Sequence, residues 1–137
     1  MNIEELRDYC LSFPQTSESL PFDENTLVFK VHDKMFVLSD IESFSFINLK
    51  CDPEKAVEIR EKYSAVTPGY HMNKKHWNSI KMDDSITDQL IKVWIKDSFE
   101  LVVRNLPNKF REQIKLTYLI IMTSCNPICS VPCIIVT

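Results

Sequence analysis

Glycine is almost absent from this sequence, because Gly69 is the only one among 137 residues. Proteins have on average about 7% glycine, so most turns here must be made by Asn, Asp, Ser and Pro. The glycine-rich loops that cradle phosphates in nucleotide-binding enzymes are excluded, since they need several glycines in one short segment. No nucleophile stands in a motif with a positioned base, so we expect a protein without enzymatic activity.

A surplus of positive charge is also missing. The chain has 16 Lys and Arg against 19 Asp and Glu, which gives a formal net charge of -3. DNA-binding proteins usually carry a basic surplus, because much of their affinity comes from neutralising phosphates. Nucleic-acid binding must therefore rest on a local basic patch, and we expect it to be weak and sensitive to salt.

Neither a secretory leader nor a cysteine framework is visible. Residues 1–5 lack the basic segment followed by an apolar one that begins a signal peptide, so we expect a cytoplasmic protein with reduced thiols. Cys10 and Cys51 lie in apolar patterns and are expected to be buried. The other cysteines, Cys125, Cys129 and Cys133, lie near the C-terminus.

Charge is absent from residues 116–137. A membrane span needs about 20 apolar residues, but Pro127, Pro132 and Asn126 interrupt this run and break any single helix. We therefore expect no membrane segment. The sequence predicts a domain over residues 1–112, followed at 113–137 by an apolar extension that contains Cys and Pro and is poorly ordered.

Hydrophobic spacing predicts the secondary structure of the domain. A helix is expected over 2–13, where Asn2 and Glu5 have the spacing of a capping box, and residues 15–25 are expected to be a loop. Alternation predicts strands at 26–31, 35–38 and 44–50. The His32-Asp33 turn lacks glycine, so a two-residue type I′ hairpin is not expected there.

The second half of the domain is also predicted to contain both helices and strands. Asp52 and Pro53 are typical of a helix start, which predicts a helix over 53–63. Two short strands are expected within 66–82, and Ser85 with Asp88 predicts the capped start of a helix over 85–105, in which Trp94 belongs to the buried face. Strands grouped between helices predict an α+β fold, an antiparallel sheet with helices packed on one face.

Basic and aromatic residues are concentrated in residues 68–82, which contain three lysines, two histidines, a Tyr and a Trp but no acidic residue. Basic residues interleaved with aromatic ones suit a surface that follows a phosphate backbone and stacks on bases, and asparagine can pair with adenine. Pro68-Gly69 fits a type II turn, where glycine takes a positive φ. The candidate nucleic-acid-binding residues are Tyr70, His71, Asn73, Lys74, Lys75, His76, Trp77, Asn78 and Lys81.

An alternative interpretation of the same segment stays open. Tyr70 and Trp77 are equally suited to anchoring the core, with the lysines in a solvated loop. His71 and His76 lack the carboxylate or thiolate partners of a metal site, so no metal or other cofactor is predicted. The acidic residues of the first helix, Glu4, Glu5 and Asp8, are expected to be solvated.

Several motifs occur in an order that resembles a known family. They are Asn2-Ile3-Glu4-Glu5-Leu6-Arg7 with Pro14, Pro21-Phe22-Asp23, Thr26-Leu27-Val28-Phe29-Lys30-Val31, Asn48-Leu49-Lys50-Cys51-Asp52-Pro53, the block from Pro68 to Asn78, and Ser98-Phe99-Glu100-Leu101-Val102. This order resembles the MmcQ/YjbR family of small bacterial proteins described as DNA-binding. The resemblance covers about residues 1–112, and the block from Pro68 to Asn78 is its most specific part.

The resemblance implies a two-layer α+β sandwich of the frataxin (CyaY) type and a DNA-binding feature called a double wing. The implied contacts map only onto residues 70–78. This sequence departs from the family at His32-Asp33, where glycines are usual, and beyond about residue 112, where we see no counterpart. The leading hypothesis is a DNA-binding protein. A protein-interaction or regulatory module whose partner contacts the same loop is the alternative, and a small-molecule site beneath the loop is a third.

Overall fold

The computed structural model describes residues 1–69 and 72–123, with side chains described as far as residue 116. The chain divides into two compact units, Met1–Asn105 and Leu106–Thr137. The first holds α1 (Ile3–Leu11), β1 (Thr16–Ser19), β2 (Thr26–Val31), β3 (Lys34–Asp40), β4 (Phe46–Lys50), α2 (Pro53–Lys62), β5 (Val66–Pro68), β6 (Trp77–Lys81) and α3 (Asp88–Arg104). The second begins with α4 (Asn108–Thr123).

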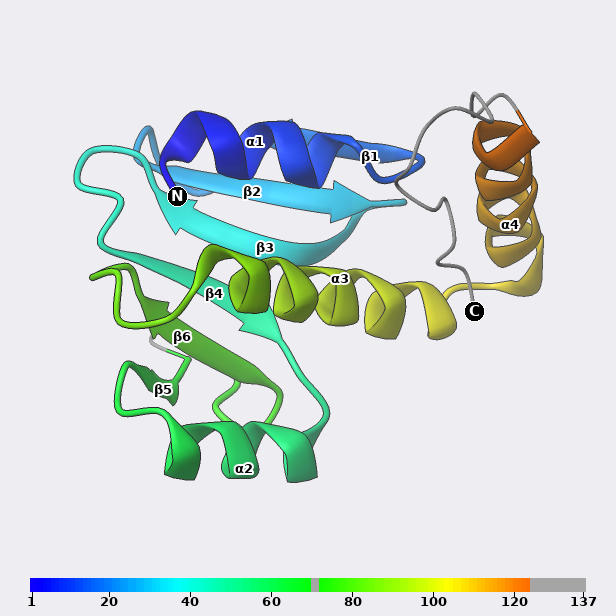
Figure 1. Cartoon of the computed structure of the whole chain (residues 1–137). Helices are drawn as coiled ribbons and strands as arrows, with labels where there is room; N and C mark the ends of the chain where they lie inside the picture. The colour runs from blue at the N-terminus through cyan, green and yellow to red at the C-terminus, as the bar shows by residue number, and fades with distance from the viewer. Residues whose placement is uncertain (70–71, 124–137) are drawn as a thin grey trace. The chain divides into compact units, whose positions relative to one another are not determined.

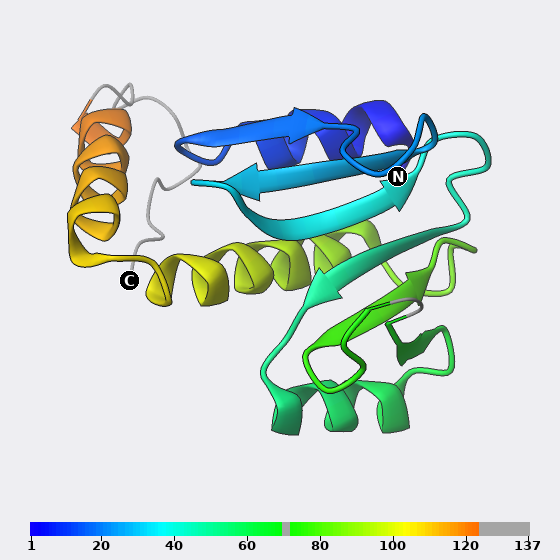
Figure 2. The same cartoon turned by 180° about the vertical axis from the view of Figure 1, so that it is seen from behind.

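The six strands form one antiparallel sheet in the order β1-β2-β3-β4-β6-β5. Both views show α1 and α3 on the same face of this sheet (Figures 1 and 2). Helix α2 packs against β5 and β6, and its Ile59 lines one small cavity together with Trp94 of α3. The predicted α+β fold with helices on one face is therefore confirmed.

Aromatic side chains make the core between the helices and the sheet. Phe13 stacks on Phe99 of α3 with ring centroids 4.6 Å apart, and Phe36 of β3 meets Phe99 edge to face at 5.4 Å. Trp94 is buried, as its place in the apolar stripe of α3 predicts. The Ser98 hydroxyl donates to the Phe36 carbonyl at 2.6 Å and accepts from the Lys50 N–H at 2.9 Å, which ties α3 to β3 and β4.

The loop predicted for residues 15–25 is wrong in its first part, because residues 16–19 form the edge strand β1. These four residues are all polar, so no apolar alternation could reveal a strand. Tertiary contacts define it instead. It pairs with β2, and Arg7 Nε and Nη2 of α1 donate to the two carboxylate oxygens of Glu18 at 2.8 and 2.6 Å.

The turn between β2 and β3 also differs from the prediction. It has two residues, and both have positive φ, 46° at His32 and 65° at Asp33, which is the backbone that a type I′ turn requires. Asp and His adopt this region more often than other non-glycine residues. The pairing on both sides outweighs the local cost, so the hairpin forms without glycine.

Two of the expected helix caps need correction. Asn2 caps α1 as predicted, since its side chain accepts from the Glu5 N–H at 2.8 Å. The N-cap of α3 lies two residues later than expected, at Thr87 rather than Ser85. The Ser85 hydroxyl donates to Asp83 in the preceding loop at 2.5 Å. Asp52 is the N-cap residue of α2, but its side chain makes no capping hydrogen bond.

The C-terminal unit crosses the predicted boundary at residue 112. Helix α4 runs through it to Thr123, so residues 113–123 of the predicted extension are helical. The three C-terminal cysteines lie outside the described residues. Among the residues that the structure describes, none of the helices has the length and hydrophobicity of a membrane span.

Asp33→Gly is expected to stabilise the protein by about 0.5–1 kcal/mol. A side chain in the left-handed region costs about 1–2 kcal/mol, and the greater flexibility of glycine in the unfolded chain offsets part of that gain. Urea unfolding measures the difference. The control is Glu24→Gly, at an exposed loop position without positive φ, which should not stabilise the protein. A less stable Asp33→Gly variant would contradict the strain at this turn.

Candidate nucleic-acid interface

The predicted binding segment connects β5 to β6, and its N-terminal end depends on Gly69. The φ of Gly69 is not positive, so the type II turn argument for this glycine is wrong. Its N–H donates to the Trp77 carbonyl at 2.8 Å, and a Cβ at this position would lie 2.7 Å from the Cβ of Trp77. Glycine is needed because the two backbones approach too closely for any side chain. Tyr70 and His71, which follow, lie outside the described residues.

Trp77 is buried, with 6% of its surface exposed. Its neighbour Asn78 faces α2, and side chains alternate along a strand, so Trp77 points to the opposite face of the sheet. There it forms a second hydrophobic cluster with Val28 and Leu38, and Met72 packs against this cluster. For Trp77 the core-anchor interpretation is therefore correct, and its ring is not available for stacking on a base.

Asn78 is also buried, with 3% of its surface exposed. Its Oδ1 accepts from Arg60 Nε at 2.7 Å, and its Nδ2 donates to the Ala56 carbonyl at 3.5 Å. Both partners belong to α2. The predicted role of Asn78 in pairing with adenine is therefore wrong, because its amide is used to hold α2 against β6.

Arg60 is the residue of this site that the sequence analysis missed. Besides its bond to Asn78, it donates from Nη2 to the Lys74 carbonyl at 2.6 Å. One guanidinium thus joins α2, β6 and the loop before β6. The available signal was an arginine in the stripe of α2 that also contains the buried Ala56, although a stripe residue alone does not reveal a bond to a segment 14 residues away.

The loop Asn73–His76, called the basic loop below, is held in a compact turn. Asn73 Oδ1 accepts from the Lys75 N–H at 3.0 Å, and the Asn73 carbonyl accepts from His76 and Trp77 at 3.1 and 3.0 Å. The His76 carbonyl accepts from the Cys51 N–H at 2.7 Å. His76 is half-buried, whereas Asn73, Lys74 and Lys75 are exposed. Fixed backbone and exposed ammonium groups therefore coincide in this loop.

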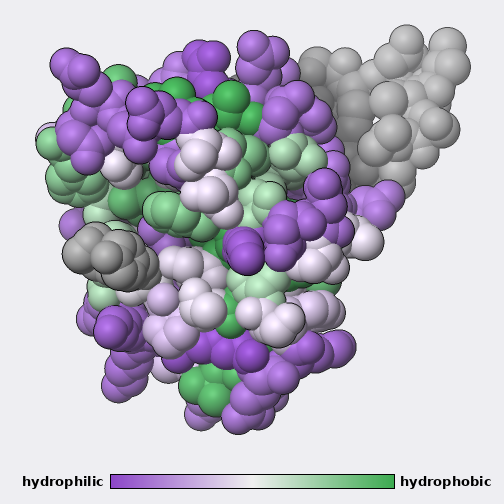
Figure 3. Space-filling view, turned by 90° about the vertical axis from the view of Figure 1, so that its left-hand side faces the viewer, coloured by the Kyte–Doolittle hydropathy of each residue, from purple (hydrophilic) through white to green (hydrophobic). Residues whose placement is uncertain are grey.

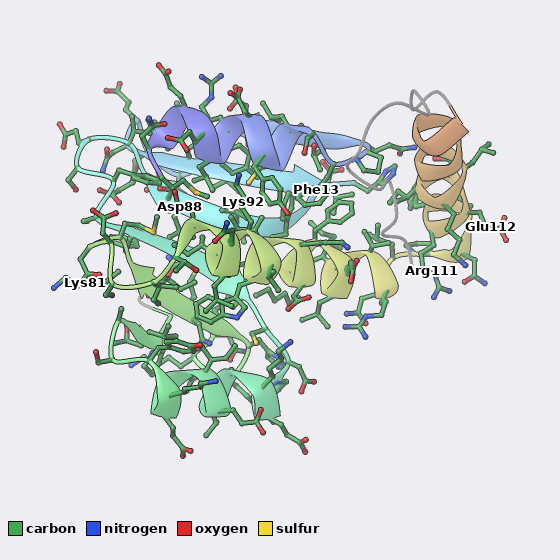
Figure 4. The ribbon with its side chains drawn as sticks, viewed as in Figure 1. Phe13, Lys81, Asp88, Lys92, Arg111 and Glu112 are labelled. Atoms are coloured by element: carbon green, nitrogen blue, oxygen red, sulfur yellow. The ribbon has the colours of Figure 1, made fainter. Side chains whose placement is uncertain are left out.

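Lys81 is separated from the basic loop. It is exposed at the far end of β6, where it pairs with Phe46, and it points away from the body of the protein (Figure 4). Four residues of strand place it about 13 Å from Trp77. Of the predicted site residues that the structure describes, only Asn73, Lys74, Lys75 and His76 lie together in one loop.

A shallow groove adjoins the basic loop. It is lined by Pro53, Glu54, Val57 and Arg60 of α2 and by Lys75. The groove combines two cations with one carboxylate and an exposed valine. Among the described residues, no group of three His, Cys, Asp or Glu side chains is placed to hold a metal ion. This arrangement can attract an anion to the loop, and it offers a small apolar contact beside it.

Gly69→Ala is expected to destabilise the protein by about 1–3 kcal/mol, because the added Cβ overlaps the Cβ of Trp77. Thermal or urea unfolding measures the effect. The sign of the change is informative. At a residue without positive φ, Gly→Ala ordinarily stabilises by about 0.4–1 kcal/mol, so a more stable variant would show that the close approach is not a constraint.

Comparisons with known proteins place the chain in a family. The family model described as YjbR matches residues 11–101. The chain is 36% identical over 113 residues to "Uncharacterized protein YbdF" of Escherichia coli O157:H7. The aligned residues cover 82% of this chain and 93% of the relative. It is 33% identical over 113 residues to "Uncharacterized protein YjbR" of Escherichia coli strain K12. Here the aligned residues cover 82% of this chain and 96% of the relative.

Solved structures agree with this relationship. The crystal structure of Deinococcus radiodurans protein DR2400, a DUF419 domain, matches with a TM-score of 0.78 and 33% identity over 83% of this chain and 88% of that chain. A Pseudomonas syringae protein matches with a TM-score of 0.62 and 28% identity over 74% of this chain and 98% of that chain. Both the sequence and the fold lead to one conclusion: the chain belongs to the YjbR family.

Proposed function

We propose that this protein binds nucleic acid through the phosphate backbone, with the basic loop as its contact surface. The observation that carries the proposal is the pair Lys74 and Lys75, which are exposed on a loop whose backbone is held by Arg60 and Asn73. No acidic residue occurs in residues 68–82. Because the loop backbone is already held, binding a polyanion does not have to order it, which reduces the entropy cost of binding.

The burial of the other candidate residues restricts how this surface can act. Trp77 and Asn78 are buried, so they supply neither stacking nor hydrogen bonds to bases. Lysine contacts with phosphates position a protein without reading sequence. Binding is therefore weak, independent of sequence and sensitive to salt. As part of this proposal the protein acts in the cytoplasm, and it acts by binding alone, without a cofactor.

A second candidate, docking of a partner protein on the same surface, is favoured by one observation. Val57 of α2 is 48% exposed and lines the groove beside Lys75. An apolar contact of this kind suits a protein partner better than a phosphate backbone. The two candidates differ in their response to salt, because phosphate binding weakens steeply as salt rises and apolar docking does not.

Lys74→Ala/Lys75→Ala is expected to weaken binding to all DNA and RNA sequences alike. The slope of log affinity against log salt should shrink by about two, roughly one per lost phosphate contact. Fluorescence anisotropy with labelled oligonucleotides over a range of salt concentrations measures both effects. The control is Lys92→Ala/Lys96→Ala, which removes the same number of lysines, both half-buried, from α3 and should leave the slope unchanged. Absence of binding by the wild-type protein at low salt would end the proposal.

Arg60→Lys tests whether the loop must be held in place. The substitution keeps the charge but loses the two directed bonds to Asn78 and to the Lys74 carbonyl. We expect affinity to fall about three- to tenfold, as for the net loss of one ordinary hydrogen bond, with the salt slope retained because the two lysines remain. Circular dichroism controls for folding. A reduced slope would instead show that Lys74 and Lys75 lose their phosphate contacts when the loop is released.

A further inference from the structure

Three loops far apart in the sequence meet at one end of the sheet. They are residues 20–25 between β1 and β2, 41–45 between β3 and β4, and 82–87 between β6 and α3 (Figure 1, at the left). Hydrogen bonds join them, since Asn25 accepts from the Ile41 and Glu42 N–H groups at 2.8 and 2.7 Å and the Ser45 carbonyl accepts from Met82 at 2.9 Å. They form one surface, called the loop end below.

Charge on the loop end has a single sign among its exposed residues. The three loops carry exposed carboxylates and no Lys, Arg or His, and the nearest cation in sequence is Lys81. Hydrogen bonds from Asn25 and Thr26 lower the pKa of Asp23, and bonds from Ser85 lower the pKa of Asp83, so both are charged at neutral pH. The exposed acidic residues are Asp23, Glu24, Glu42, Asp83 and Asp84.

The same surface exposes large apolar side chains. Phe22 is 63% exposed, Leu20 is 47% exposed and Ile41 is 38% exposed. These are three of the seven large hydrophobic residues that are exposed among the described ones, and they occur in two loops that hydrogen-bond to each other. Figure 3 looks onto this end and shows hydrophobic groups set among hydrophilic ones. A gathering of apolar side chains rimmed by polar residues marks an interaction site in a soluble protein.

The loops are also held in shape before any partner binds. The Asp23 carboxylate accepts from the Asn25 and Thr26 N–H groups at 2.8 and 2.7 Å, which fixes the turn that carries Phe22. At the other side Asp40 accepts from the Ser45 and Phe46 N–H groups at 3.0 and 3.3 Å, which fixes the loop that carries Ile41. Presentation on fixed loops reduces the entropy that binding must overcome.

We propose that the loop end is a docking surface for a basic, amphipathic polypeptide segment of a partner protein. Aliphatic or aromatic side chains of that segment contact Leu20, Phe22 and Ile41, and its Lys or Arg residues pair with the surrounding carboxylates. Charge complementarity selects this occupant, because nucleic acid, anionic membranes and acidic peptides are all repelled by the rim. The surface shares no residue with the basic loop, so the inference does not depend on the proposed function.

The test uses the full chain and a labelled amphipathic helical peptide of Leu and Lys, about 14 residues long. Fluorescence anisotropy should show binding of this peptide and none of its counterpart with Glu in place of Lys. Amide shifts in an NMR titration should concentrate in residues 20–25, 41–45 and 82–87.

Two pairs of variants separate the apolar and the charged contributions. Phe22→Ser/Ile41→Ser should weaken peptide binding about tenfold or more, as loss of two anchor residues does. The control Leu11→Ser/Val93→Ser removes similarly exposed side chains from α1 and α3 and should change nothing. Glu24→Gln/Glu42→Gln, which leaves the apolar anchors intact, should weaken binding about threefold at low salt, and Glu58→Gln/Glu61→Gln on α2 should not.

Several results would overturn the proposal. These are no binding of the lysine peptide, equal binding of the glutamate peptide, equal losses in the control variants, or shifts centred outside the three loops. Sedimentation of the chain alone tests a second copy as the occupant. Self-association that Phe22→Ser/Ile41→Ser abolishes would make the loop end a contact between copies of this chain, and the proposed partner would be rejected.

Discussion

Strand β6 is buried on both faces, and the placement of α2 and of the basic loop depends on this constraint. Four successive residues, Trp77 to Ile80, are buried in a strand whose side chains alternate between two sides. Asn78 and Ile80 face the helices, and Trp77 lies against a second cluster on the other face. A central strand of this kind needs cover on both sides. Helix α2 supplies it on one face, and Met72 of the loop before β6 contributes on the other.

Arg60 links the position of α2 to that of the basic loop. Because its guanidinium reaches both the buried amide of Asn78 and the carbonyl of Lys74, α2 cannot be placed without also placing the basic loop. Gly69 also helps to fix this segment, because it lets the chain approach Trp77 closely at the end of β5. Trp77 and Asn78, the residues that looked most suited to reading bases, are buried and hold the fold, whereas Lys74 and Lys75 are exposed.

The loops at the two ends of β6 carry opposite charges. The strand begins at the basic loop, with Lys74 and Lys75, and it ends at a loop that carries Asp83 and Asp84. The net charge of -3 sums over the whole chain and reveals neither region. The two proposed partners accordingly carry opposite charges, a polyanion at the basic loop and a basic polypeptide at the loop end. The fold thus separates two surfaces that a count of charges places on one weakly acidic protein.

Residue patterns alone determined the α+β class, the apolar faces of the helices with Trp94 buried, the cap at Asn2 and the exclusion of a glycine-rich phosphate loop. Each depends on neighbours within a few residues, which the sequence displays directly. Tertiary structure decided the strand at 16–19, the turn at His32-Asp33, the burial of Asn78 and the role of Arg60. The strand, Asn78 and Arg60 depend on partners distant in the sequence, and the turn depends on the pairing of β2 with β3. In each case strand pairing or buried hydrogen bonds outweigh local preference. The meeting of three acidic, apolar loops follows from sheet order, which no local pattern contains.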